Sequence, residues 1–162
     1  MKPYMKKRDA GTVTSLINDG RSILAWAEVS FIVHATEREE LITSMFHERL
    51  GIPIERFHVR QYEGHYGNPI ALFKARIDRA NADRFAILLF SLLGDEARNQ
   101  FLPDLARHLD DKGVLYLRID RGSFAVGKVA IGEESPIRIR MKAAKRHRSG
   151  EPLDGYLSLT GN

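Results

Sequence analysis

Two runs of alternating side chains, at residues 56–62 and 71–77, most constrain what this chain can fold into. Strand side chains point in turn to opposite faces of a sheet, so each run predicts a strand with one apolar and one basic face. The basic parity of the two runs holds Arg56, His58, Arg60, Tyr62, Lys74 and Arg76, together with Leu72. The other parity, with Phe57, Val59 and Phe73, predicts a core face, and the two runs pair with matched faces.

Three further stretches, residues 25–34, 114–120 and 137–142, alternate in the same way, and residues 127–131 form a shorter candidate strand. In two of these stretches the outward positions are aromatic or basic, namely Tyr116, Arg118, Arg138, Arg140 and Lys142. We therefore expect the division between an apolar and a basic face to extend across the whole sheet.

Helical spacing separates the strands. Thr36 and Glu39 form a capping-box pattern at the start of one helix, which Gly51 ends. Residues 82–93 are apolar nearly all round and predict a second helix, and residues 95–112 predict a third helical region. The element order β-α-β-β-α-α-β-β-β predicts an α+β fold, a mostly antiparallel sheet with helices packed on one face.

The patterned region, residues 25–143, has the size of a single globular domain. Residues 1–24 are poorly patterned and predict a loosely ordered or hairpin extension. Residues 144–162 predict a basic, loosely ordered tail, in which Tyr156 and Leu159 offer apolar side chains for docking.

Positive charge is concentrated near the two ends of the chain. Ten of the 25 basic residues lie there, namely Lys2, Lys6, Lys7, Arg8, Arg138, Arg140, Lys142, Lys145, Arg146 and Arg148. The remaining 15 basic residues are outnumbered by 21 acidic ones. Concentrated cations on an otherwise acidic chain indicate a polyanionic partner, nucleic acid first; two solvated tails are the alternative.

Several classes of protein are disfavoured by what the sequence lacks. There is no cysteine, hence no disulfide framework or thiolate metal site, and the six histidines lack the spacing of paired metal ligands. The longest apolar run, residues 85–93, is about half the roughly 20 residues that cross a bilayer. We therefore expect a cytoplasmic protein without a membrane span, metal or cofactor.

The connection between the two opening strands is the block EGHYGNPI, residues 63–70. Gly64 and Gly67 permit unusual backbone angles, and Asn68 before a proline favours a turn, so the block shapes this connection. His65 and Tyr66 either contact ribose, base or phosphate, or pack over the end of the sheet.

The outward parity of four strands holds eight lysines and arginines among eleven positions. Such cations neutralise phosphates, and tyrosine or arginine planes stack on unpaired bases, so we hypothesise binding to structured RNA. The candidate RNA ligands are Arg56, His58, Arg60, Tyr62, His65, Tyr66, Asn68, Lys74, Arg76, Tyr116, Arg118, Arg138, Arg140, Lys142, Lys145, Arg146 and Arg148. No catalytic residue is assigned.

Three alternatives stay open. The polar parity is also that of an ordinary solvated sheet face. A metal-independent ribonuclease would use His65 and Glu63 as acid and base, although no recognised catalytic motif accompanies them. An assembly protein would pair two copies through the apolar helix or a strand edge, with the cations serving solubility.

Four segments together resemble an archaeal RNA-binding family described as exosome-subunit-like: VHATE at residues 33–37, EGHYGNPI at 63–70, LYLRID at 115–120 and PIRIRMK at 136–142. The resemblance covers residues 25–143. It implies a fold similar to the ribosomal protein that holds 5S rRNA, a homodimer, and a non-enzymatic RNA role. It also implies an accessory part in RNA processing or degradation, with the exosome as a candidate partner.

Overall fold

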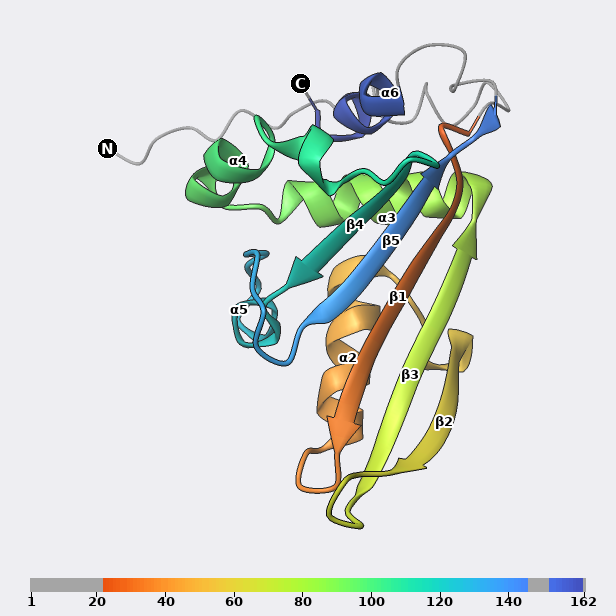
Figure 1. The fold of residues 1–162 in the computed structure, drawn as a ribbon, viewed down its shortest axis with the longest axis vertical. Coiled ribbons are helices and arrows are strands. Elements are labelled where there is room, and N and C mark those ends of the chain that lie inside the picture. Colours follow the sequence, from red (N-terminus) through yellow and green to blue (C-terminus); the bar gives the residue numbers. More distant parts are fainter. Residues whose placement is uncertain (1–21, 146–151, 162) are drawn as a thin grey trace.

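The computed structural model describes residues 22–145 and 152–161 (Figure 1). One five-stranded sheet, in the order β2-β3-β1-β5-β4, has every neighbouring pair antiparallel. The strands are β1 Leu24–His34, β2 Phe57–Glu63, β3 Pro69–Asp78, β4 Val114–Ile119 and β5 Ile137–Ala143. The α+β prediction is confirmed.

Helices cover one face of this sheet. They are α2 Glu39–Leu50, α3 Arg79–Ser91, α4 Asp95–Phe101, α5 Arg121–Ala125 and α6 Pro152–Leu159, with the 3-10 turns η1 Ile54–Arg56 and η2 Leu105–His108. In Figure 1, α2 and α3 lie behind the sheet, and the strands facing the viewer carry no helix. None of the described helices therefore covers the side chains on that side.

An aromatic cluster fills the space between the sheet and α2. The Phe31 ring stacks on Phe46 and on Phe73, with centroids 4.7 and 5.1 Å apart, and Phe57 meets it edge-on at 5.5 Å. Phe31 and Phe73 are opposite each other on β1 and β3. The apolar parity of the sequence thus forms the core, as predicted.

The first helix does not have the side-chain cap that was predicted for its N-terminus. α2 starts at Glu39 with Arg38 as its N-cap, and no side chain caps it, so the capping box of Thr36 and Glu39 is wrong. Glu37 Oε2 instead accepts a hydrogen bond from the His34 amide at 2.8 Å, which closes the turn after β1. The predicted end is confirmed, because Gly51 has the left-handed φ of 67° that favours glycine.

The candidate strand at residues 127–131 is also wrong. Val129 bridges Leu93 and Ile131 bridges Ile119, so its residues pair singly with two different partners instead of forming a ladder. Before it, Asp120 caps the short helix α5 by accepting hydrogen bonds from the Ser123 amide and hydroxyl. These bonds hold the pKa of Asp120 below its usual range.

The predicted loose tail contains an ordered helix. Tyr156 of α6 is fully buried; its hydroxyl donates to the Gly113 carbonyl at 2.6 Å and accepts from the Ala143 amide at 3.1 Å. Leu159 is buried too. Docking of this segment is therefore confirmed, and its predicted loose order is wrong for residues 152–161, because a single hydroxyl satisfies buried backbone groups of β5 and of the turn before β4.

Candidate functional site

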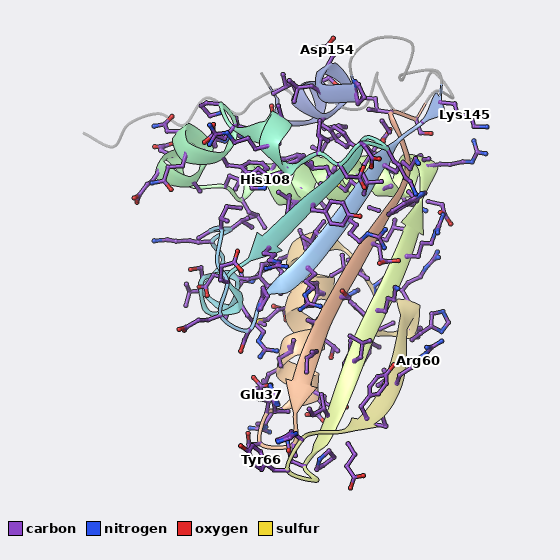
Figure 2. The ribbon with its side chains drawn as sticks, in the orientation of Figure 1. Glu37, Arg60, Tyr66, His108, Lys145 and Asp154 are labelled. Atoms are coloured by element: carbon purple, nitrogen blue, oxygen red, sulfur yellow. The ribbon has the colours of Figure 1, made fainter. Side chains whose placement is uncertain are left out.

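The outward side chains of all five strands form one surface, which we call the open face (Figure 2). It consists of Trp26, Glu28, Ser30, Ile32 and His34 on β1, His58, Arg60 and Tyr62 on β2, Leu72, Lys74 and Arg76 on β3, Tyr116 and Arg118 on β4, and Arg138, Arg140 and Lys142 on β5. The strand register brings these residues into rows across the sheet. The predicted gathering of eleven positions onto one face is thus found for ten of them, all except Arg56.

One acidic residue lies at the centre of the open face. Glu28 Oε1 is 3.4 Å from Lys74 Nζ and 3.3 Å from Arg140 Nη1, and its side chain is only 12% exposed. Like charges on facing strands repel, so this shared carboxylate offsets repulsion between two of the cations. The open face therefore carries a carboxylate among its cations.

A row of alternating cations and rings crosses the same region. Arg76 Cζ lies 5.0 Å from the centre of the Trp26 ring. Arg140 Cζ lies 5.4 Å from Trp26 and 5.4 Å from Tyr116. These cation–π contacts, worth roughly 0.5–1 kcal/mol each at exposed sites, keep the guanidinium groups close to the rings. Planar surfaces and positive charge thus alternate along one row.

Trp26 and Glu28 were missed by sequence reasoning. The alternation of residues 25–34 places both on the outward side of a strand. The predicted basic face, however, included only residues of the other four strands. The register that sets Glu28 between Arg76 and Arg140 depends on non-local pairing. The sequence around Glu28 therefore does not indicate which residues of β3 and β5 lie opposite it.

The cations of the open face differ in how far they are neutralised. Arg76 pairs with Asp78 at 3.3 Å, and Arg118 with Glu133 at 2.7 Å. Within the described part of the chain, three others form no ion pair, namely Arg60, Arg138 and Lys142. Their charge is therefore not balanced by any acidic side chain among the described residues.

The EGHYGNPI block forms the tight turn between β2 and β3, as predicted. The Gly64 amide donates to the Asn68 carbonyl at 2.7 Å, and the Gly67 amide donates to the Gly64 carbonyl at 2.9 Å. A Cβ on Gly64 would lie 2.6 Å from Asn68 Oδ1, so a larger residue there would displace the Asn68 side chain, and Gly67 has the left-handed φ of 75° that favours glycine. The His65 and Tyr66 rings meet edge-on at 5.0 Å, and Tyr66 is 91% exposed at the far end of the sheet (Figure 2).

Other predicted ligands lie apart from the open face. Arg56 is in η1, not in β2, and lines a groove with Ile77 and Arg84 on the helix side. Lys145 lies at the opposite end of the sheet from Tyr66 (Figure 2). Two predicted ligands, Arg146 and Arg148, and the predicted extension up to residue 21 lie outside the described residues.

The site has no sign of a metal centre or of a paired acid and base. Across residues 22–145 and 152–161, no three His, Asp or Glu side chains gather as a metal site requires. No hydrogen bond joins Glu63 to His65 among the contacts of the described residues. None of the described helices is long and apolar enough to cross a membrane.

Comparison with known proteins assigns the chain to a family. The model of a protein family described as RNA binding matches residues 26–143. The chain belongs to this RNA-binding family. A curated relative, RNA-binding protein PAB1135 of Pyrococcus abyssi, is 31% identical over 116 residues, covering 68% of this chain and 75% of the relative. The family match, residues 26–143, contains every residue of the open face, from Trp26 to Lys142, and ends before α6.

Solved structures share the fold of this RNA-binding family member. Protein AF2318 from Archaeglobus fulgidus is 25% identical with a TM-score of 0.66, covering 84% of this chain and 99% of that one. Mth689, a DUF54 protein from Methanothermobacter thermautotrophicus, is 20% identical with a TM-score of 0.67, covering 85% and 98%. The likeness to the ribosomal protein that holds 5S rRNA stays a prediction.

Replacing Glu28 by glutamine is expected to tighten RNA binding several-fold. The substitution keeps the side-chain shape and removes the negative charge that Lys74 and Arg140 share, so both cations become available to phosphate. The free energy of unfolding should fall by about 1 kcal/mol, because the two cations then repel each other. Filter binding of a structured RNA and urea unfolding measure the two effects.

The matched control is Asp78→Asn, which removes an exposed carboxylate paired with Arg76 at the margin of the same face. It should change both quantities less than Glu28→Gln. Weaker RNA binding by Glu28→Gln in a protein that remains folded would show that Glu28 orders the cations for the ligand instead of competing with it.

Proposed function

We propose that the chain is a non-enzymatic RNA-binding protein whose open face binds the phosphate backbone. The observation that carries the proposal is a set of cations that form no ion pair among the described residues: Arg60 on β2, and Arg138 and Lys142 on β5, all on one face of the sheet. Cations spread over a sheet follow a backbone without reading its bases. We therefore expect affinity with little sequence preference from this part of the surface.

The rings of the open face give it a second kind of contact. Tyr116 and Tyr62 are exposed, and Trp26 is half-buried beside Arg76 and Arg140. Unpaired bases stack on aromatic rings and on guanidinium planes, which distinguishes a single strand or loop from a duplex. This supports a structured RNA with an unpaired segment as the ligand.

We further propose a cytoplasmic, accessory role in RNA processing or degradation, with the exosome as a candidate partner, and a homodimer as the working form. These proposals are supported by the sequence resemblance and, more generally, by the membership of an RNA-binding family. Both faces of most of β2 are exposed, which leaves room for a second copy at this edge of the sheet. A dimer that covers the open face would contradict the RNA proposal.

The proposal predicts a steep dependence of RNA affinity on salt. Each neutralised phosphate contributes about −0.7 to −0.9 to the slope of log affinity against log salt, so three contacts give roughly −2 to −3. Fluorescence anisotropy with a labelled RNA hairpin from 50 to 500 mM salt measures it. The RNA should remain intact on a gel after the titration; a flat salt response, or shortened RNA that His65→Ala leaves intact, would contradict the proposal.

A further inference from the structure

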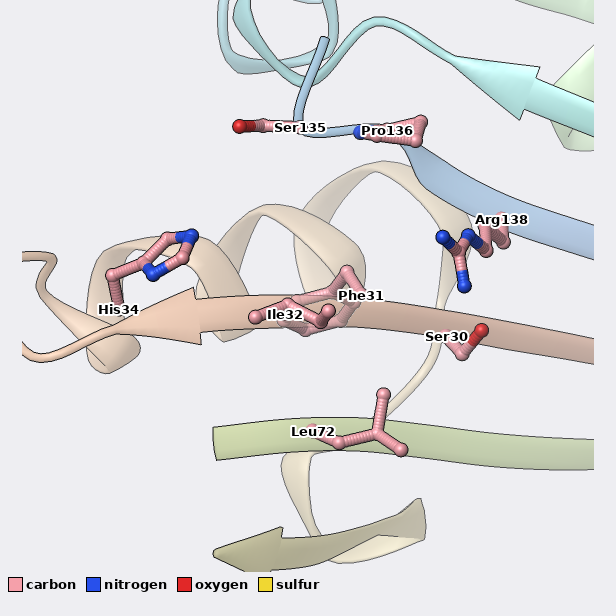
Figure 3. A pocket seen from close by; sticks show the side chains of 8 residues that line it. All are labelled: Ser30, Phe31, Ile32, His34, Leu72, Ser135, Pro136 and Arg138. Atoms are coloured by element: carbon pink, nitrogen blue, oxygen red, sulfur yellow. The ribbon is translucent and has the colours of Figure 1, made fainter. Parts of the chain in front are cut away.

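A small cavity opens on the open face between β1 and the start of β5 (Figure 3). Its volume is about 90 Å³. A single water needs roughly 10–15 Å³ of such volume, so the cavity has room for a group much larger than one water. It is the part of the face where two neighbouring strands stop pairing.

The cavity exists because β5 starts too late to pair with the end of β1. The last pair between them is Ser30 with Arg138, and antiparallel register would set Pro136 opposite Ile32. Proline has no amide hydrogen to donate, and Ser135, with its positive φ of 43°, turns the chain away. The two segments diverge as a result.

Arg121 satisfies the edge of β1 that this divergence exposes. Its Nη1 donates to the Ile32 carbonyl at 2.6 Å, and its Nη2 donates to Glu37 Oε1 at 2.7 Å. The Arg121 side chain is largely buried. At the Ile32 carbonyl, the Arg121 side chain thus takes the place of a strand partner.

The lining combines an apolar surface with a polar rim. Ile32, which is 39% exposed, and Leu72 provide aliphatic carbon. Ser30, His34 and Arg138 stand around them (Figure 3). Arg138 forms no ion pair with the residues that the structure describes.

We propose that this cavity receives one unpaired nucleobase of the bound RNA, with Arg138 on the adjoining phosphate. A base presents a flat apolar face to Ile32 and Leu72, and its edge carries donors and acceptors for Ser30 and His34. A phosphate alone would leave the aliphatic surface without a partner. The inference rests on the proposed function and adds a subsite for a base that is not paired in a helix.

The test compares two RNA hairpins that differ in one group. One carries a single bulged nucleotide, and the other carries an abasic residue at the same position, so both have the same phosphates. The wild-type protein should bind the base-bearing hairpin about tenfold more tightly, within the range of single base contacts. The δ1 methyl resonance of Ile32 should shift with this hairpin and stay in place with the abasic one.

Two variants separate the base from the phosphate. Ile32→Phe fills the cavity at an exposed position, and it should abolish the tenfold preference while it leaves the salt slope unchanged. Arg138→Gln should weaken both hairpins by a similar factor. Circular dichroism confirms that both variants are folded.

Three results would overturn the inference. Equal wild-type affinity for the two hairpins, with a steep salt slope, removes the base subsite and leaves the proposed function standing. An unchanged preference in Ile32→Phe places the base elsewhere. Absence of salt-dependent binding to either hairpin removes the proposed function and the subsite together.

Discussion

Replacing Arg60, Arg138 and Lys142 together by alanine is expected to weaken RNA binding about 100-fold at 0.15 M salt. Each phosphate contact contributes about 0.7–0.9 to the salt slope, which at this concentration corresponds to roughly four- to sixfold in affinity. Arg60 is on β2, whereas Arg138 and Lys142 are at opposite ends of β5. None of the three forms an ion pair within the described residues, so their effects should multiply. The slope itself should become shallower by about 2 to 3.

The matched control removes three cations that lie outside the open face, Arg56, Arg84 and Arg107. All three are exposed, and the change in net charge is identical. If binding depends on the open face, the control should keep most of its affinity. Equal loss in the two triple variants would show that net charge alone attracts the RNA, and the open face would lose its role.

Replacing Asp83 by alanine is expected to cost about 3 kcal/mol in the free energy of unfolding. Asp83 is only 4% exposed, and its carboxylate accepts hydrogen bonds from the Ile23 amide at 2.9 Å and the Leu24 amide at 2.8 Å. It therefore ties α3 to the start of β1. Each buried amide left without an acceptor costs roughly 1–3 kcal/mol.

Urea unfolding followed by circular dichroism measures this loss. Asp111→Ala is the matched control: the residue is exposed, and such surface substitutions usually change stability by less than about 0.5 kcal/mol. A change below about 1 kcal/mol in Asp83→Ala would mean that water or another group takes over the two amides. The start of β1 would then be less dependent on α3 than the hydrogen bonds indicate.

The local part of this fold could be predicted from the sequence. Period-two alternation assigned the faces of all five strands, because the direction of a strand side chain depends only on its position along its own strand. Gly51 was recognisable as a helix end for the same reason, since its left-handed φ is a local requirement. Val59 has the predicted parity but is 44% exposed, because β2 is an edge strand.

The rest depended on distant partners. Glu37 can accept a hydrogen bond from the His34 amide only where the chain turns after β1, so the capping box predicted from Thr36 does not form. Val129 and Ile131 found separate partners instead of one strand. The burial of Tyr156 depends on a site formed by Gly113 and Ala143, which no pattern in the last residues reveals.

The features of the candidate site also divide into those that local pattern predicted and those that depended on other parts of the chain. The cations of the open face followed from alternation, whereas the ion pairs that neutralise Arg76 and Arg118 did not, because Asp78 and Glu133 reach them from a strand end and a loop. The cavity beside Arg138 was equally inaccessible, since it depends on where β5 stops pairing with β1. Sequence thus predicted which residues face outward, and the structure shows which of them form ion pairs with other described residues.

Arg121 has a further consequence for how this protein behaves at high concentration. A strand edge with free carbonyl and amide groups is a template onto which a strand of another molecule can add, and such additions lead to aggregation. The guanidinium donates a hydrogen bond to the Ile32 carbonyl at the point where β1 and β5 stop pairing. This carbonyl is therefore not available to a strand of another molecule. The arginine therefore protects solubility at the point where the sheet is least complete.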